Sequence, residues 1–418
     1  MRRQLFAAAV VLVALSGAAG AKEQELNGVV IDVPRGWKVE RGEAGSLLLQ
    51  QEFPETDDEE RGAALIQLVA PRAVEGTLLQ GVATMVGAIP ELAEEDTTTE
   101  GEGVTSNGYD MVVQYRCCGR VQDIQASLTT VAVGDSGKQA FLQLLTMNLH
   151  DEREDEVDAE FAKMVRTMRL KEEDAPFAVA SREGDGGLEG AYTFLRTGLM
   201  PNVFGGMDFT ADSEVVVFDP SGLFSDTIPA GDMSDFCAEH PEDCGTYRVS
   251  GGGFWGGQRQ IELRRVADAF GRFEVETMPL EIGKDSLTIG EDVHAKVPPF
   301  PADTKFDGEW RYFFASSGMS ASGSGSIAVE RFLRLRPDGT YQRDGFVGAS
   351  SSMDTGGGTN GVTTSNQRPS TAGRYRVEGY KLILAGDDGS EEVMSIFAPD
   401  KGSDELLVID GSNYLKQD

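Results

Sequence analysis

The chain has 418 residues, of which 69 are acidic and 37 are basic, and its formal net charge is −32. Such an acidic composition excludes nucleic acid and anionic membranes as expected partners, because both are bound through basic faces. The length predicts two or three domains. The sequence contains no run of about 18 apolar residues, so it predicts no membrane span.

The first residues, Met1–Ala21, have the pattern of a secretory signal peptide. Arg2 and Arg3 precede the apolar run Leu5–Leu15, and the small residues Ala19–Ala21 suit cleavage. No cysteine stands at the cleavage position, so a lipoprotein anchor is not expected. We therefore expect the mature protein to be secreted, or to reside in the periplasm or at the cell surface.

Residues 22–170 predict one α+β unit. Its expected elements, in order, are strands at Val29–Val33, Ser46–Phe53 and Ala64–Ala70, a helix between Thr77 and Pro90, strands at Tyr109–Cys117, Asp123–Val133 and Lys138–Met147, and a helix at Asp155–Leu170. The last segment has apolar residues at clear helical spacing. The predicted order is β-β-β-α-β-β-β-α.

Short motifs in this unit point to a known family. The first strand is followed by Pro34-Arg35-Gly36-Trp37, and the closing helix contains the apolar run from Phe161 to Met168. With its element order, the unit resembles the PsbP-like family, whose domains share a mixed αβα sandwich. The resemblance implies a non-enzymatic accessory role, as in photosystem assembly in plants and in assorted exported bacterial proteins. It assigns a role to no particular residue.

Cys117 and Cys118 are adjacent within a predicted strand. Neighbouring strand residues point to opposite faces, so a bridge between the two requires a distorted backbone, which the following Gly119 makes conceivable. A vicinal disulfide, a pair of free thiols and pairings with other cysteines are all compatible with the sequence.

Residues 171–187 are charged, then small and polar, and predict a linker. From residue 188 the chain changes to short alternating runs rich in glycine, and it repeats itself. The block that begins at Gly190 matches the block that begins at Gly308, and a Pro-x-Gly-x-aromatic block follows each, 30 positions later at Pro220 and 29 positions later at Pro337. A Gly-x-Tyr-Arg-Val block then occurs in both copies. We assign repeat one to 188–296, a proline-rich connector to 297–303 and repeat two to 304–418.

Each repeat predicts an all-β meander of seven or eight short strands, closed as an up-and-down barrel or packed as a sandwich. Gly308-Glu-Trp310 with the later Pro337–Tyr341 is similar to lipocalin- and avidin-like small barrels. Trp310, Tyr312 and Tyr341 are therefore candidate ligand-binding residues. The alternative is that these aromatic residues form the barrel core.

The longest insertions occupy the same place in the two copies, Ser225–Asp243 and Gln342–Thr371. Both are expected to be loops, serving for binding or, in the Ser/Gly-rich second copy, lacking order. Cys237 and Cys244 in the first repeat are expected to form a disulfide, as suits an exported chain. Reduced, they and His240 could instead ligate zinc, but export and the spacing favour the disulfide, so no metal site is predicted.

No catalytic constellation is found. The chain has three histidines, and Gly134-Asp-Ser-Gly137 is interpreted as a hairpin turn. We predict an exported non-catalytic binding or accessory protein that recognises a small apolar ligand or a protein partner through its duplicated β modules, without a cofactor. The alternatives are a carboxylate-based envelope hydrolase acting on cell-wall sugar or lipid, and a structural spacer or assembly factor. The sequence carries no signal for an oligomeric state.

Overall fold

The computed structural model describes residues 21–417 except 43–44, 56–60, 73–75, 96, 136–137, 181–185, 202–206, 230, 253–256, 321–322 and 355–358. The predicted signal peptide, apart from Ala21, lies outside the described residues. The chain forms two compact units: unit 1 is Met1–Phe177 with Ala269–Arg272, and unit 2 is Ala178–Asp268 with Phe273–Asp418. The division after Phe177 falls within the predicted linker.

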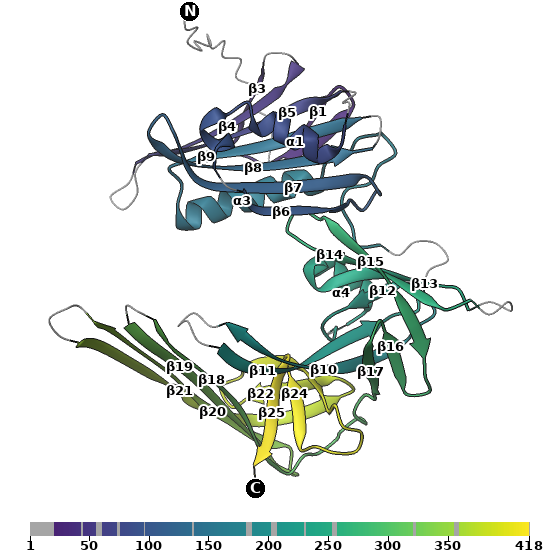
Figure 1. Ribbon diagram of the computed structural model, residues 1–418. Coiled ribbons are helices and arrows are strands. Elements are labelled where there is room, and N and C mark those ends of the chain that lie inside the picture. The colour runs from purple at the N-terminus through teal and green to yellow at the C-terminus, as the bar shows by residue number, and fades with distance from the viewer. Residues whose placement is uncertain are drawn as a thin grey trace, which may run out of the picture. The chain divides into compact units, whose positions relative to one another are not determined.

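Unit 1 combines a β-hairpin, a larger antiparallel sheet and helices (Figure 1). The hairpin pairs β1 (Lys22–Leu26) with β2 (Val29–Val33). The larger sheet has the order β6-β7-β8-β9-β5-β4-β3. Its strands are β3 (Lys38–Arg41), β4 (Leu47–Phe53), β5 (Gly62–Arg72), β6 (Thr97–Val104), β7 (Asp110–Val121), β8 (Ile124–Gly134) and β9 (Gln139–Met147). The helices are α1 (Leu78–Val86), α2 (Pro90–Ala93) and α3 (Asp151–Arg166).

The two faces of this sheet carry separate apolar cores. Val131 and Val133 of β8 pack in one cluster with Phe161 of α3, whereas Ala132 between them packs in another cluster with Val82 of α1. Successive strand residues point to opposite faces, so α1 and α3 cover opposite sides of the sheet. Each helix buries an apolar stripe on the strands, which is what keeps helices of this length folded.

The structure contains elements that the sequence analysis did not predict: β1, β3, β6 and α2. The four residues of β3 are all exposed, and β6 consists largely of threonine, glutamate and glycine. Such strands lie at the edge of the buried region, so they lack the apolar alternation by which strands are recognised. Helix α2 is a single turn that begins at Pro90, the residue that was expected only to end the preceding helix.

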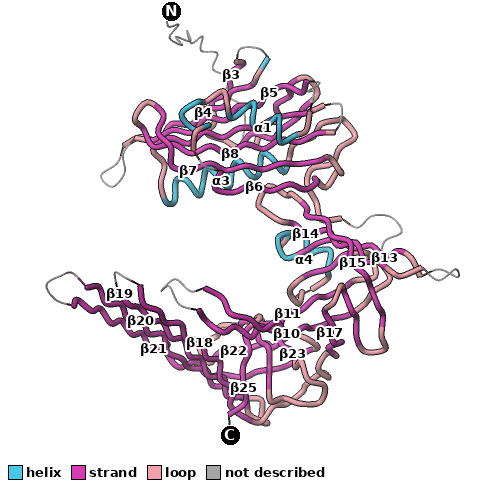
Figure 2. Tube along the Cα trace, in the orientation of Figure 1, coloured by secondary structure: helices cyan, strands magenta, loops and turns pink. Residues whose placement is uncertain are grey.

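Unit 2 consists of two closed eight-stranded barrels, and Figure 2 shows how strongly strands dominate it. In barrel 1 each strand pairs with the next, and β10 closes the ring by pairing with β17. Its strands are β10 (Gly190–Pro201), β11 (Met207–Phe218), β12 (Leu223–Ser225), β13 (Cys244–Ser250), β14 (Gln260–Val266), β15 (Phe273–Ile282), β16 (Ser286–Ile289) and β17 (Asp292–Val297). The predicted meander is thus a barrel and not a sandwich.

Barrel 2 has the same up-and-down connectivity, closed by β18 against β25. Its strands are β18 (Gly308–Ser320), β19 (Gly323–Leu335), β20 (Thr340–Asp354), β21 (Thr359–Glu378), β22 (Lys381–Gly386), β23 (Glu391–Phe397), β24 (Leu406–Ile409) and β25 (Ser412–Gln417).

No helix in the described part of the chain is long and apolar enough to cross a membrane.

The repeated tyrosine blocks perform the same task in both barrels. The hydroxyl of Tyr247 accepts a hydrogen bond from the amide of Leu188 at 2.9 Å and lies 2.9 Å from the carbonyl oxygen of the same residue. The hydroxyl of Tyr375 does the same with Phe306, at 2.9 Å and 3.3 Å. Each tyrosine therefore fixes the segment that enters its barrel, which gives the sequence repeat a structural reason.

The prediction that Gln342–Thr371 forms a loop is wrong. The described residues of this segment form most of the long hairpin of β20 and β21. The two strands pair from Thr340 to Asp354, with one irregularity between Arg343 and Gly345. Beyond the barrel core a strand needs backbone partners but no apolar face. The Ser/Gly-rich composition of this segment therefore gave no sign of a strand. Figure 1 shows β18–β21 projecting past the shorter strands of the barrel. The insertion of repeat one instead contains α4 (Met233–Glu239) and the 3-10 turn η2 (Pro241–Asp243).

Candidate ligand cavity

The interior of each barrel is packed with apolar side chains. Barrel 2 is filled around the fully buried Trp310, with Leu335 and Ile396 in the same cluster. Barrel 1 is filled in the same way around Phe218 and Tyr247. Some of these core residues, Val216, Leu263 and Ile289, also border a cavity.

A cavity of about 870 Å³ opens at one end of barrel 1 and is bounded on its other side by strands of barrel 2. We call it the barrel 1 cavity. Tyr192 belongs to the core of barrel 1, and alternate strand residues share a face, so Phe194 and Arg196 continue the inner face into the cavity. On β11, Val216 and Glu214 follow Phe218 in the same manner. The cavity is thus the polar continuation of an apolar barrel interior.

Two ion pairs lie among the charged groups of this wall. Arg196 and Glu214 form an ion pair of 3.1 Å between neighbouring strands. Arg265 forms a second ion pair with Asp226, and its guanidinium lies 4.7 Å from the centre of the Phe224 ring. The wall also contains Glu276, Asp292 and Lys381, so it is polar and carries more acidic than basic groups.

Two of the three histidines of the chain line the cavity. The ring of His294 packs against Phe194, with ring centres 5.5 Å apart, and its Nδ1 lies 3.1 Å from the carbonyl oxygen of Asp292. His240 lies at the end of α4, its ring 5.0 Å from that of Phe236. Each ring is thus oriented by an aromatic neighbour.

Strands of barrel 2 supply the opposite wall, and a buried contact holds them in place. Tyr380, which lines the cavity, donates a hydrogen bond of 2.6 Å to the carbonyl oxygen of Val297. Phe397 of barrel 2, also a lining residue, is buried in one cluster with Ala191 and Val297. Burial raises the pKa of the Tyr380 hydroxyl above its ordinary value of 10.

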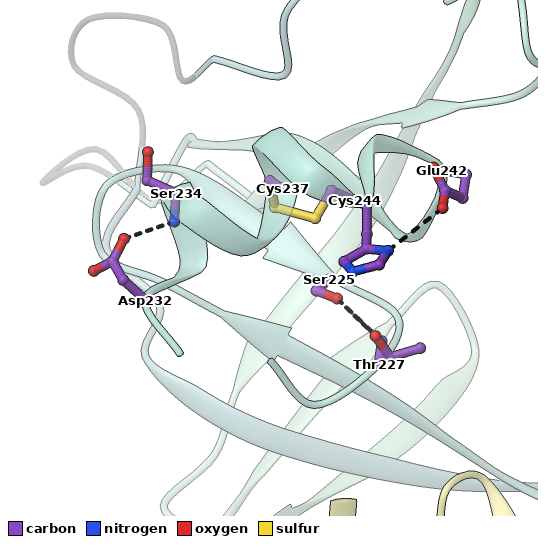
Figure 3. Close-up of a disulfide and its surroundings, with 8 residues drawn as sticks. Ser225, Thr227, Asp232, Ser234, Cys237, Glu242 and Cys244 are labelled. Carbon is purple, nitrogen blue, oxygen red and sulfur yellow. Dashed lines mark hydrogen bonds and ion pairs between the residues drawn. A yellow bond between two sulfur atoms is a disulfide. The ribbon is translucent and has the colours of Figure 1, made fainter. Parts of the chain in front are cut away.

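A disulfide between Cys237 and Cys244 closes the segment that carries α4 and η2, with the Cα atoms 5.5 Å apart (Figure 3). Asp232 caps α4 by accepting a hydrogen bond of 2.8 Å from the amide of Ser234. The segment places Asp243 at the cavity wall. Desolvation, together with the neighbouring charge of Glu242, raises the pKa of the Asp243 carboxyl.

The three residues predicted to bind a ligand, Trp310, Tyr312 and Tyr341, lie together in barrel 2. Trp310 is fully buried and donates a hydrogen bond of 2.7 Å to the carbonyl oxygen of Asp404. Tyr341 is buried in the same cluster, and the half-buried Tyr312 packs against it, its ring 5.8 Å from that of Tyr414. None of the three predicted ligand-binding residues is among those that line the cavity.

Cys117 and Cys118 are joined as a vicinal disulfide. The distortion that this bridge requires is visible: Cys118 has a φ of +73°, and the pairing of β7 with β8 shifts register between Arg116 and Gly119. This disulfide lies in unit 1 and has no part in the barrel 1 cavity.

Sequence reasoning missed the residues that build the cavity wall, above all Arg196, Glu214 and Arg265. A signal was present, because each stands two positions from an inward-facing apolar residue of a strand. Charged residues at inward positions of a strand, following apolar inward residues, indicate where a packed barrel interior ends. Applying that pattern requires the strand boundaries and their register, which the sequence alone did not supply.

Comparison of the chain with protein-family models and with curated proteins finds no match.

Proposed function

We propose that this protein is an exported, non-catalytic binding protein whose ligand occupies the barrel 1 cavity. The carrying observation is the cavity itself, about 870 Å³ in volume and formed where two packed barrels adjoin. Binding sites for small molecules are commonly clefts of roughly 300–1,000 Å³ with mostly apolar walls and a few placed polar groups. A protein with packed barrel centres and one such opening is suited to hold a small ligand there.

The wall suggests the chemistry of the ligand. Phe194, Met278 and Phe397 offer apolar and aromatic surface, and the ion pairs of Arg196 and Arg265 offer charged hydrogen-bonding groups. A mainly apolar molecule with one polar end satisfies both parts of the wall. A purely hydrocarbon ligand would displace water from the polar groups of the wall without offering them hydrogen bonds in return.

The carboxylates of the cavity favour binding over hydrolysis. A carboxylate-based hydrolase requires two carboxyl groups that act as acid and base on a substrate. Glu214 and Asp226 are instead engaged by arginines. Because these two carboxylates are held in ion pairs, we place the hydrolase alternative behind the binding function.

For unit 1 we propose an accessory role, as the resemblance to PsbP-like domains implies. The packing of α1 and α3 on opposite faces of its sheet supports an αβα arrangement. Export of the protein remains part of the proposal and rests on the pattern of Met1–Ala21. The two disulfides agree with an oxidising compartment.

Fluorescence titration with the uncharged apolar dye Nile red tests the binding function. Val393 lines the cavity and is 50% exposed, whereas Leu415, on another strand of barrel 2, is 58% exposed and is not a lining residue. Val393→Trp adds bulk inside the cavity and Leu415→Trp adds the same bulk elsewhere. We expect saturable binding to the wild type and to Leu415→Trp, and at least tenfold weaker binding to Val393→Trp. Absence of saturable binding, or equal binding by both variants, would refute the proposal.

A further inference from the structure

The backbone between Cys237 and Cys244 is held by several independent contacts. The disulfide ties its two ends, and α4 passes directly into η2. The amide of His240 donates to the carbonyl oxygen of Phe236 at 2.8 Å, and the amide of Asp243 donates to that of His240 at 3.2 Å. Figure 3 shows the disulfide and, on the same segment, the side chain of Glu242. Side chains on this segment therefore start from a fixed framework.

Three metal-ligating side chains converge on that framework. His240, Glu242 and Asp243 each offer a ligand atom, and the three atoms lie within 4.8 Å of one another. Nδ1 of His240 is 3.7 Å from a carboxylate oxygen of Glu242. Ligands bound to one Zn²⁺ at about 2.1 Å in tetrahedral geometry are separated by about 3.4 Å. Small side-chain rotations are therefore enough to bring the three atoms to one ion.

We propose that His240, Glu242 and Asp243 form a binding site for a divalent transition-metal ion such as Zn²⁺. An imidazole nitrogen favours Zn²⁺ and its neighbours over Ca²⁺ and Mg²⁺, and two carboxylates balance the charge of the ion. Cys237 and Cys244 are committed to the disulfide and supply no thiolate. The site differs in its ligands from the cysteine-based zinc site considered from the sequence, and the disulfide supports it rather than competing with it.

The proposed metal site lies at the wall of the barrel 1 cavity. His240 and Asp243 both line the barrel 1 cavity. Three protein ligands leave a coordination position for water or for a donor atom of a bound molecule. Because two of the three ligating residues line the cavity, an ion held by them would lie at the cavity wall, where it can bind the polar end of a ligand. The metal site itself does not depend on the proposed ligand-binding function.

Isothermal titration with Zn²⁺ in the presence of excess Ca²⁺ tests the proposal on the full chain with its disulfides intact. Excess Ca²⁺ occupies sites made of carboxylates alone. His294→Gln is the matched control, because His294 lines the same cavity but belongs to no group of three ligating residues among those described. We expect one Zn²⁺ per chain, at least tenfold weaker binding by His240→Gln, and unchanged binding by His294→Gln.

The imidazole proton resonances provide a readout that folding defects do not imitate. The chain has three histidines, so His150, His240 and His294 can be assigned by substituting each in turn. We expect Zn²⁺ to shift the signals of His240 and to leave the other two in place. No uptake of Zn²⁺ by the wild type, or a shift centred on His294 or His150, would overturn the proposal.

Discussion

Two buried hydroxyl groups connect the repeated sequence to the stability of the barrels. The hydroxyls of Tyr247 and Tyr375 each satisfy a backbone amide at a barrel entrance, that of Leu188 or Phe306, at 2.9 Å. Tyr247→Phe and Tyr375→Phe each leave that buried amide without its partner, at a cost of about 1–3 kcal/mol in the free energy of unfolding. Urea unfolding followed by tryptophan fluorescence measures the loss.

The control for this prediction is Tyr192→Phe. The hydroxyl of Tyr192 donates to the carbonyl oxygen of the exposed residue Glu189, at 3.2 Å, where water can replace it. We expect this variant to unfold within about 0.5 kcal/mol of the wild type. Equal losses in Tyr192→Phe and Tyr247→Phe would show that the buried contacts have no special role.

A carboxyl group on α3 makes the stability of unit 1 depend on pH. Desolvation, followed by the charges of Glu154 and Asp155, raises the pKa of Asp158 from 3.8 to about 6. The folded state therefore holds this proton more tightly than the unfolded state does. The resulting stabilisation is complete below about pH 3.8 and is lost as the pH rises through 6.

Asp158→Asn removes this charge, so we expect the variant to be more stable than the wild type at pH 7.5, by about 1 kcal/mol after allowance for solvent screening. The difference should disappear as the pH falls below about 4. Thermal unfolding across this pH range measures it, with Glu152→Gln, an acid in the first turn of the same helix, as the control. A difference that grows toward acid pH would contradict the assignment.

Single residues were predictable where local chemistry decides their role. The spacing of Cys237 and Cys244 indicated a disulfide, and the structure contains it. Trp310 was weighed as ligand contact or core, and it lies in the core because a barrel centre requires large apolar side chains. The contacts of Arg196 were beyond the sequence, because they depend on which strand lies beside β10.

The long hairpin of β20 and β21 gives a prediction at the level of elements. Phe346, Val347 and Gly348 of β20 pair with residues of both β19 and β21, so their amides belong to a central strand. We expect hydrogen exchange in this segment to be at least tenfold slower than in the loop 398–404 of the same barrel. Exchange as fast as in that loop would restore the loop interpretation of this stretch.

Secondary structure was predictable from the sequence where burial dictates a period. The closing helix of unit 1, predicted at Asp155–Leu170, is found four residues earlier at Asp151–Arg166. The strands β8 and β9, which are buried along most of their length, lie within one residue of their predicted bounds. The exposed β3 and the polar β20–β21 extension carry no such pattern. These segments are strands because their backbones hydrogen-bond to neighbouring strands. Such pairing depends on the whole fold and cannot be predicted from the residues of the segment alone.

For the whole molecule, the internal repeat was the strongest predictor of architecture. Two copies with matching blocks indicated two similar β modules, and the structure forms two closed barrels of equal strand number. The barrel 1 cavity could not be predicted, because its walls come from both modules: Phe194 and Met278 from one, Tyr380 and Phe397 from the other. The repeat identifies each module but says nothing about the surface on which the two meet.

The central claim is that the barrel 1 cavity holds a small molecule. Native and denaturing mass spectrometry of the protein, purified from its own organism without reductant and freed of metal ions with a chelator, tests it most directly. We expect the native mass to exceed the denatured mass by a fixed increment in the wild type and in Leu415→Trp, and not in Val393→Trp. Equal native and denatured masses in the wild type, or the same increment in all three proteins, would contradict the account.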